Sequence, residues 1–247
     1  MIVLFTDFGL VGPYTGQVIT VLTREAPGVP VISLFADAPA GQPKPSSYLL
    51  AAYAAWFPAG TVLLCVVDPG VGSQRRAVIV AADGRFHVGP DNGLFEIVLR
   101  RAASAQRQAL CWEIIWRPPM LSASFHGRDL FAPVAARLAR GEAPSTMART
   151  VTPTRFADWP DDLAEIVYID HYGNAMTGMR GDVVAASASL LCGGRTIAHA
   201  RTFSAVPPGA AFWYVNSNGL IEIAVNGGRA DRLLGLSIGS KVGVEAP

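Results

Sequence analysis

TVLLCVV at residues 61–67, followed at once by DPGVGS at residues 68–73, is the stretch that decides the fold. Seven consecutive residues that are almost all apolar predict a strand buried inside a sheet, and the proline and glycines after it predict a tight loop. In open α/β sheets, ligands bind beyond the carboxyl ends of the strands. Asp68 is therefore a candidate functional residue.

On both sides of this strand, short apolar runs alternate with helical patterns through the first half of the chain. The expected strands and helices occupy residues 2–5, 15–24, 29–35, 46–56, 77–82, 85–88 and 129–140, with a hairpin turn at Asp83-Gly84. This alternation predicts an α/β domain over residues 1–155, in which helices cover a mainly parallel sheet.

The second half has a different pattern. Residues 142–162 are rich in Pro, Thr, Ala and Asp without an apolar period, which predicts a linker. Beyond it, Gly, Asn or Pro separate short apolar runs at residues 165–169, 187–191, 212–215 and 220–225. Short strands with few helices predict a small all-β domain, barrel-like or a sandwich, over residues 163–247.

Composition restricts the partners and the compartment. Of 247 residues, 51% are hydrophobic and 16% are charged, and the formal net charge is +1. Because this balance provides no field to hold a polyanion, we expect a small-molecule partner rather than nucleic acid or a membrane surface. The three cysteines lack C-x-x-C spacing and predict neither a disulfide framework nor a zinc site. Without a signal-peptide pattern or an uninterrupted apolar run of roughly 18 residues, the protein is expected to be cytoplasmic.

Four polar clusters lie in loops where a ligand is expected, and each also has a structural interpretation. They are Thr6–Gly9, Asp68–Gly72 with Arg75 beyond it, Gly89–Gly93 and Phe125–Asp129. Taken singly, Asp7 could cap a helix, Asp68 and Asp91 could form turns, and His126 could be structural.

Taken together, the clusters predict a water-activating site. An Asp, an Arg and a His from separate loops, Asp68, Arg75 and His126, have the chemistry to orient a water molecule, stabilise hydroxide character and accept a proton. None of them is a strong nucleophile with its own base, which favours direct attack by water over a covalent intermediate.

The motifs that contain these clusters resemble those of the S-adenosyl-L-methionine (SAM) hydroxide adenosyltransferases, the hydrolytic relatives of the fluorinase and chlorinase. The matching runs are TDFG-x-x-x-PY-x-G, FPAGTV-x-x-x-VVDPGVGS-x-RR, VGPDNGL, SFHGRDLFAPVAA, ID-x-x-GN and NS-x-G-x-x-EIAVNGG, in family order from residue 2 to about residue 243. The resemblance implies hydrolysis of SAM to adenosine and L-methionine, without a cofactor or metal. It also implies an α/β domain followed by a β-barrel domain, and a homotrimer with active sites between subunits.

The resemblance assigns roles to individual residues. The water-activating residues of the family fall on Asp68, Arg75 and His126, and its ribose-binding Asp falls on Asp7. Asp170 and Asn174 match positions that meet the methionine amine and the adenine. The full set of expected substrate contacts is Asp7, Phe8, Tyr14, Phe125, Asp170, Asn174 and Ser217. The halogenating relatives carry tyrosines in place of Asp68 and His126, so hydrolysis is favoured over halogenation.

Three departures from the family pattern affect the expected substrate contacts. Gly12 replaces a usual acidic residue, Ala36 falls in a replaced D-I-T-H segment, and Gly41 stands near an expected aromatic or apolar residue. They motivate one alternative, a protein that binds adenosine or SAM without catalysis. A second alternative is a metal-dependent hydrolase using Asp7, Asp68, Asp91, His126 and Asp129. The positive charge of Arg75 would repel such a metal.

Overall fold

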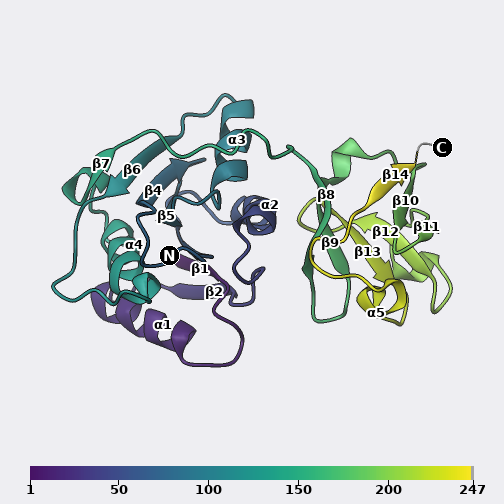
Figure 1. Ribbon diagram of the computed structural model, residues 1–247, viewed down its shortest axis with the longest axis horizontal. Helices are drawn as coiled ribbons and strands as arrows, with labels where there is room; N and C mark the ends of the chain where they lie inside the picture. Colours follow the sequence, from purple (N-terminus) through teal and green to yellow (C-terminus); the bar gives the residue numbers. More distant parts are fainter. Residues whose placement is uncertain (246–247) are drawn as a thin grey trace. The chain divides into compact units, whose positions relative to one another are not determined.

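The computed structural model describes residues 1–245 and divides the chain into two compact units (Figure 1). Unit 1 is Met1–Ala157 and unit 2 is Asp158–Pro247. The last two residues of the predicted second domain, 246 and 247, lie outside the described residues.

Unit 1 is built on a seven-stranded sheet with the strand order β2-β1-β3-β5-β4-β6-β7. Its strands are β1 Ile2–Thr6, β2 Val31–Phe35, β3 Val62–Val66, β4 Ala77–Ala82, β5 Arg85–Pro90, β6 Leu110–Ile114 and β7 Ala148–Thr150. Every residue of β1 and of β3 is buried, as their uninterrupted apolar sequences predict. The strand at residues 61–67 therefore lies near the middle of the sheet, next to β1 and β5.

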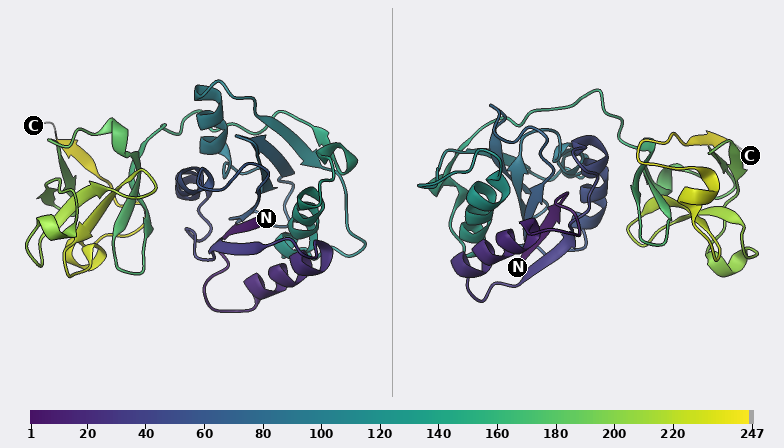
Figure 2. Two further views of the ribbon diagram at one scale, coloured as in Figure 1. Left: turned by 180° about the vertical axis from the view of Figure 1, so that it is seen from behind. Right: turned by 60° about the horizontal axis from the view of Figure 1, so that its bottom comes forward.

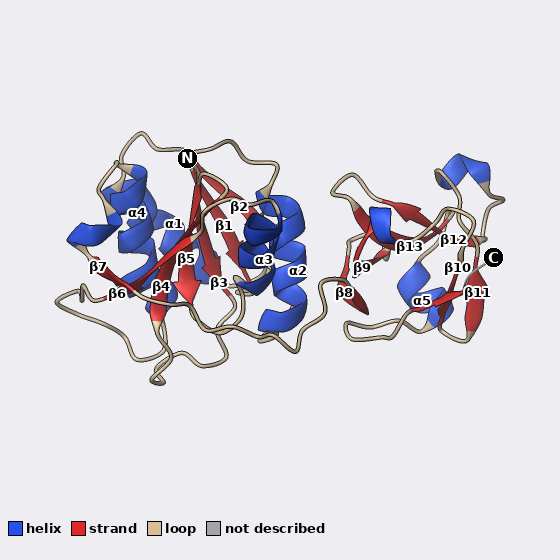
Figure 3. Ribbon diagram, turned by 90° about the horizontal axis from the view of Figure 1, so that it is seen from above, coloured by secondary structure: helices blue, strands red, loops and turns tan. Residues whose placement is uncertain are grey.

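Helices cover both faces of this sheet (Figure 3). They are α1 Tyr14–Glu25, α2 Pro43–Ala54, α3 Glu96–Ser104, a five-residue π-helix η1 Gly127–Phe131, α4 Ala132–Ala139 and the 3-10 turn η2 Pro144–Thr146. Helix α1 runs beside α4 in both views of Figure 2, and α2 packs with α3. Apolar residues of α1 and α4 join those of β1 and β3 in one buried cluster.

Unit 1 is an α/β domain, as predicted, but its sheet is mixed rather than mainly parallel. The parallel pairs are β1 with β2, β1 with β3 and β3 with β5, whereas β4 pairs antiparallel with β5 and β6, and β6 antiparallel with β7. The predicted hairpin at Asp83-Gly84 forms, and both turn residues have positive φ angles of 51° and 73°. Because β5 inserts between β3 and β4, the strands alternate in direction from β5 to β7, and only β4 and β7 run opposite to β1, β2 and β3.

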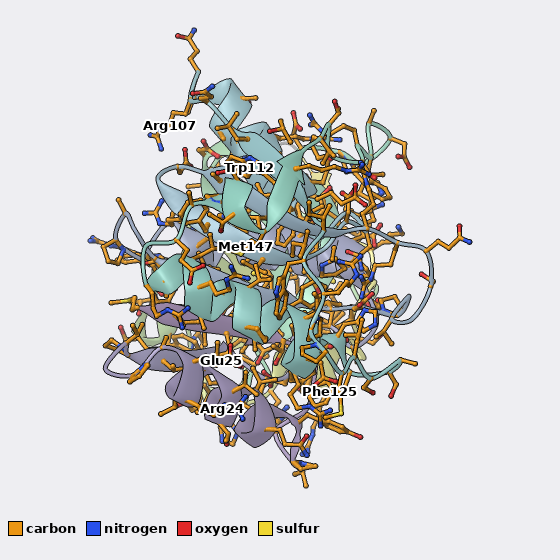
Figure 4. All side chains as sticks on the ribbon, turned by 90° about the vertical axis from the view of Figure 1, so that its left-hand side faces the viewer. Arg24, Glu25, Arg107, Trp112, Phe125 and Met147 are labelled. Carbon is orange, nitrogen blue, oxygen red and sulfur yellow. The ribbon has the colours of Figure 1, made fainter. Side chains whose placement is uncertain are left out.

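The segment predicted as a linker contributes to unit 1. Residues 148–150 form β7 at the sheet edge, and Met147 before them is only 1% exposed. Figure 4 shows Met147 and Trp112 on the sheet, where Met147 belongs to the buried apolar cluster and Trp112 packs against it. The strand was missed because its three residues are too few to show a period.

Unit 2 contains two antiparallel sheets. The four-stranded sheet has the order β12-β13-β9-β8 and the three-stranded sheet the order β11-β10-β14. The elements are β8 Leu163–Ile169, β9 Ala175–Arg180, η3 Gly181–Val183, β10 Ser189–Cys192, β11 Arg195–Ile197, η4 Phe203–Ala205, β12 Ala211–Val215, β13 Leu220–Val225, α5 Ala230–Leu234 and β14 Gly243–Glu245. Single bridges, Glu165 with Lys241 and His199 with Trp213, join strands of the four-stranded sheet to residues two positions outside β14 and β11. Within residues 1–245, no helix is both long and apolar enough to cross a membrane.

Candidate active site

Two aspartates emerge side by side at the carboxyl ends of β1 and β3. Thr6 and Val66, the last residues of these strands, are paired, and the backbone N–H of Asp7 donates to the carbonyl of Val66 at 3.2 Å. Asp68 follows two residues after Val66. Parallel pairing therefore brings Asp7 and Asp68 to one edge of the sheet, where ligands bind in open α/β folds.

Asp68, Arg75 and His126 form one hydrogen-bonded set. Arg75 Nε donates to both carboxylate oxygens of Asp68, at 2.9 and 3.0 Å, and a second donor, Nη2, contacts Oδ2. Arg75 Nη2 also lies 3.0 Å from His126 Nδ1. The side chains of Arg75 and Asp68 are 11% and 4% exposed, so solvent weakens this pair much less than a surface ion pair.

The Arg75 contact fixes the tautomer of His126. A guanidinium has only N–H donors, so His126 Nδ1 must be the acceptor and the neutral ring carries its proton on Nε2. Burial lowers the pKa of His126, and the positive charge of Arg75 lowers it further. The site thus holds a carboxylate, a guanidinium and an imidazole whose neutral form is favoured.

Arg75 also lies over the ring of Phe131, whose centroid is 5.3 Å from the guanidinium carbon. Phe131 is completely buried at the end of η1, the π-helix that begins directly after His126. No sequence pattern predicts this contact. Its only signal is the position of Phe131 in the run FHGRDLFAP, which does not show that the ring faces Arg75.

Close backbone approaches hold these loops together. At Gly72, where φ is +79°, a β-carbon would lie 2.6 Å from the carbonyl oxygen of Ala123. At Gly127, a β-carbon would lie 2.9 Å from the ring of Phe8. Glycine permits both approaches, so the loop of Asp68 and Arg75 touches the segment that carries His126.

A cavity of about 80 Å³ opens between these loops. Its lining includes the carboxylates of Asp7 and Asp68 and the ring of His126. Phe8 and Phe125 also line it, with ring centroids 5.6 Å apart, and Tyr14 lies 5.4 Å from Phe125. Figure 4 shows Phe125 near α1. The cavity thus is lined by both polar groups and aromatic rings.

Asp7 does not cap a helix, which removes that interpretation. Helix α1 begins at Tyr14 and its N-cap, Pro13, makes no side-chain hydrogen bond. Instead, Asp7 Oδ2 accepts a 2.8 Å hydrogen bond from the backbone N–H of Gly41. Burial raises the pKa of Asp7, with the nearby charge of Asp68 as a smaller contribution in the same direction.

Of the three departures from the family pattern, two make main-chain contacts near Asp7 and one is exposed. Gly41 donates its backbone N–H to Asp7, and the carbonyl of Ala36 accepts from Gly9 at 2.6 Å. At both positions the main chain makes the contact, whatever the side chain. Gly12 is exposed, with a φ angle of +121°.

The remaining predicted contacts all lie in unit 2. Asp170 and Asn174 bracket the loop between β8 and β9, where Asn174 donates to both carboxylate oxygens of Asp170, from N at 2.8 Å and from Nδ2 at 3.0 Å. Ser217 is exposed in the loop between β12 and β13. Two separate loops of unit 2 therefore carry these side chains.

Two carboxylates of the metal alternative are bound by arginines. Asp91 Oδ2 accepts from Arg76 Nε at 2.9 Å and from the Thr154 hydroxyl at 2.8 Å, and Asp129 accepts from Arg128 Nε at 2.6 Å. Over residues 1–245, no group of three His, Cys, Asp or Glu side chains is arranged to hold a metal ion. These two aspartates have structural partners, so the donor set does not favour that alternative.

Comparisons with known proteins agree over almost the whole chain. Residues 2–148 match the model of the SAM hydroxide adenosyltransferase N-terminal domain, and residues 164–243 match that of the C-terminal domain. A protein of Thermus thermophilus named (R)-S-adenosyl-L-methionine hydrolase is 40% identical, over 96% of each chain. A protein of the same name from Salinispora arenicola is 37% identical, over 98% of this chain and 96% of that protein.

Solved structures also resemble this chain. The crystal structure of an uncharacterized conserved protein from Thermotoga maritima has a TM-score of 0.89 and 28% identity, with complete coverage of both chains. A conserved hypothetical protein from Thermus thermophilus has a TM-score of 0.76 and 35% identity, over 98% of each chain. The likeness therefore extends over both units.

Proposed function

This chain belongs to the SAM hydroxide adenosyltransferase family, and we propose that it is a hydrolase that splits S-adenosyl-L-methionine with water into adenosine and L-methionine. The observation that carries the proposal is the partly buried, hydrogen-bonded Asp68–Arg75–His126 set beside the cavity at the ends of β1 and β3. The positive sulfur of SAM makes ribose C5′ electrophilic and leaves as a neutral thioether. The reaction therefore needs a positioned water and no acid for the leaving group.

We assign proton acceptance to Asp68 and water orientation to His126. Asp68 Oδ1 accepts one hydrogen bond from Arg75 and Oδ2 accepts two, so Oδ1 has the greater capacity left for a proton. His126 Nδ1 is engaged by Arg75, which leaves Nε2–H as a donor to the oxygen of the water. Arg75 stabilises the hydroxide character that develops during attack.

Substrate binding is proposed to use both units. Asp7 binds the ribose hydroxyls, and Phe8, Tyr14 and Phe125 provide the apolar wall. Asp170, Asn174 and Ser217 contact the methionine amine and the adenine. We further propose a homotrimer with shared sites, and a barrel-like unit 2, for which the two single bridges are the support. SAM is the substrate, and the proposed steps use only side chains of the protein.

The test is chromatographic detection of adenosine after purified protein is mixed with SAM. Asp68→Ala and His126→Ala should each lower turnover by at least about tenfold, because proton transfer and water positioning are lost. Asp182→Ala, which changes an exposed carboxylate, serves as the matched control and should keep full turnover. Near wild-type rates in either site variant would contradict the assignment.

The same assay separates the alternatives. SAM binding without adenosine, under conditions in which a relative turns over, would favour a non-catalytic binding protein. Activity that a chelator abolishes and added metal restores would favour the metal-dependent hydrolase. We expect the chelator to leave activity unchanged, since Asp91 and Asp129 are already bound by arginines.

A further inference from the structure

Glu222 is a buried acid that the proposed reaction does not use. It lies in the middle of β13 and is 2% exposed. Its carboxylate accepts hydrogen bonds from two neutral donors, the hydroxyl of Tyr214 at 2.5 Å and Nδ2 of Asn216 at 2.7 Å. Burying a carboxylate is costly even when it is hydrogen-bonded, so an acid at this position calls for an explanation.

The bond to Asn216 fixes the loop that carries Ser217. With Nδ2 held by Glu222, the side-chain oxygen of Asn216 accepts from the backbone N–H groups of Asn218 and Leu220, both at 3.0 Å. All three bonds depend on one orientation of a single amide. Glu222 thereby sets the conformation of the chain on both sides of Ser217, although it does not contact that residue.

Glu222 also lies near the second loop of unit 2 that carries predicted substrate contacts. It stands opposite Met176 of β9, and β9 begins directly after Asn174. Burial raises the pKa of Glu222, and the negative charge of Asp170 contributes in the same direction. Glu222 is thus bound to the loop of Ser217 and lies on the strand next to the one that follows the loop of Asp170.

We propose that Glu222 is a positioning residue for substrate binding, which acts through Asn216 and Tyr214 to hold the Ser217 loop in its binding conformation. This inference rests on the proposed function, because Ser217 matters only if unit 2 binds SAM. Water activation depends on Asp68, Arg75 and His126, which belong to unit 1. Loss of Glu222 should therefore weaken binding and leave the chemical step intact.

The test compares Glu222→Ala with Glu222→Gln in steady-state hydrolysis of SAM. Glu222→Ala leaves the donors of Tyr214 and Asn216 without their acceptor and should raise KM by about tenfold, with kcat within about twofold. Glu222→Gln can accept from Asn216 and donate to the Tyr214 oxygen, so it should restore KM to within about threefold of wild type. A purely structural role would not separate KM from kcat or show this rescue.

Asn216→Ala tests the same connection if Glu222→Ala fails to fold. It removes the amide that links Glu222 to the loop and should raise KM by a similar factor, with kcat again preserved. A wild-type KM in folded Glu222→Ala or Asn216→Ala would overturn the proposal, as would a fall in kcat at unchanged KM. If the wild-type protein releases no adenosine, the proposed function fails, and calorimetric binding of SAM to the same variants still decides the role of Glu222.

Discussion

At the scale of single residues, the partly buried His126 and the fully buried His87 have different environments. His126 has Arg75 on one ring nitrogen and a cavity beside it, whereas His87 is fully buried on β5, next to Ala54 and Val98 in the lining of another cavity. Burial lowers the pKa of His87 from 6.5 to about 4, and the charge of Arg85 acts in the same direction. His87 is therefore neutral in the folded protein at pH 5 and becomes protonated on unfolding.

The buried environment of His87 predicts that this residue makes the folded protein less stable in acid. Because the folded pKa of His87 is depressed, its contribution to stability is present above pH 6.5 and is lost as the pH falls towards 4. Between pH 7 and pH 5, the wild-type protein should lose about 2 kcal/mol more unfolding free energy than His87→Leu. Urea unfolding of both proteins at the two pH values measures this. Equal losses would show that His87 does not titrate on unfolding.

Candidate residues of the site could be predicted from the sequence more readily than the contacts that hold those residues in place. Asp68, Arg75 and His126 stand out because each lies in a glycine-containing loop after or before a regular element, and the structure brings these three together. The tautomer of His126 and the ring of Phe131 under Arg75 could not be predicted. Both depend on side-chain directions across 50 or more residues of chain, which residue spacing does not encode.

At the scale of elements, the contact of two loops at Gly72 determines the geometry of the site. Gly72 lies between Asp68 and Arg75, and Ala123 lies three residues before His126. The added methyl group of Gly72→Ala would collide with the Ala123 carbonyl and separate the loops. Because a displacement of about 1 Å can cost ~10²-fold in rate, kcat should fall by at least about tenfold.

Gly28→Ala is the matched control for this prediction. Gly28 has the same φ angle of +79° as Gly72, but a β-carbon there would meet nothing within 4 Å. Both variants therefore carry similar backbone strain, and only Gly72→Ala carries the collision. Measured kcat values that fall equally in the two variants, or in neither, would refute a role for the loop contact.

Elements were predicted where apolar runs are long enough to show a pattern. The buried strands β1 and β3 and the β4–β5 hairpin follow directly from their residues. The place of β5 between β3 and β4 does not, because sheet order depends on contacts distant in sequence. The mixed sheet was missed for this reason.

At the scale of the whole molecule, the place where unit 1 ends depends on contacts that the amino-acid composition of the segment does not reveal. Glu96 is 1% exposed at the start of α3, and it accepts from Arg155 Nε at 2.9 Å and from Arg100 Nε at 2.7 Å. Arg76 donates to the carbonyl of Thr152 at 3.0 Å. A stretch rich in Pro, Thr and Asp thus behaves as part of the folded unit rather than as a linker, since its polar groups bind a buried carboxylate and an arginine.

Two truncations test this boundary. Residues 1–157 keep β7 and the Arg155–Glu96 pair and should unfold cooperatively without unit 2. Residues 1–141, cut where the linker was predicted to begin, lose β7 and leave Glu96 with Arg100 alone. Because the shorter fragment loses the paired strand β7 and one of the arginines that bind the buried Glu96 carboxylate, it should be less stable by at least about 1 kcal/mol, as measured by urea unfolding followed by circular dichroism. Equal stability of the two fragments would mean that residues 142–157 add nothing to unit 1, and that the sequence pattern located its end better than the contacts do.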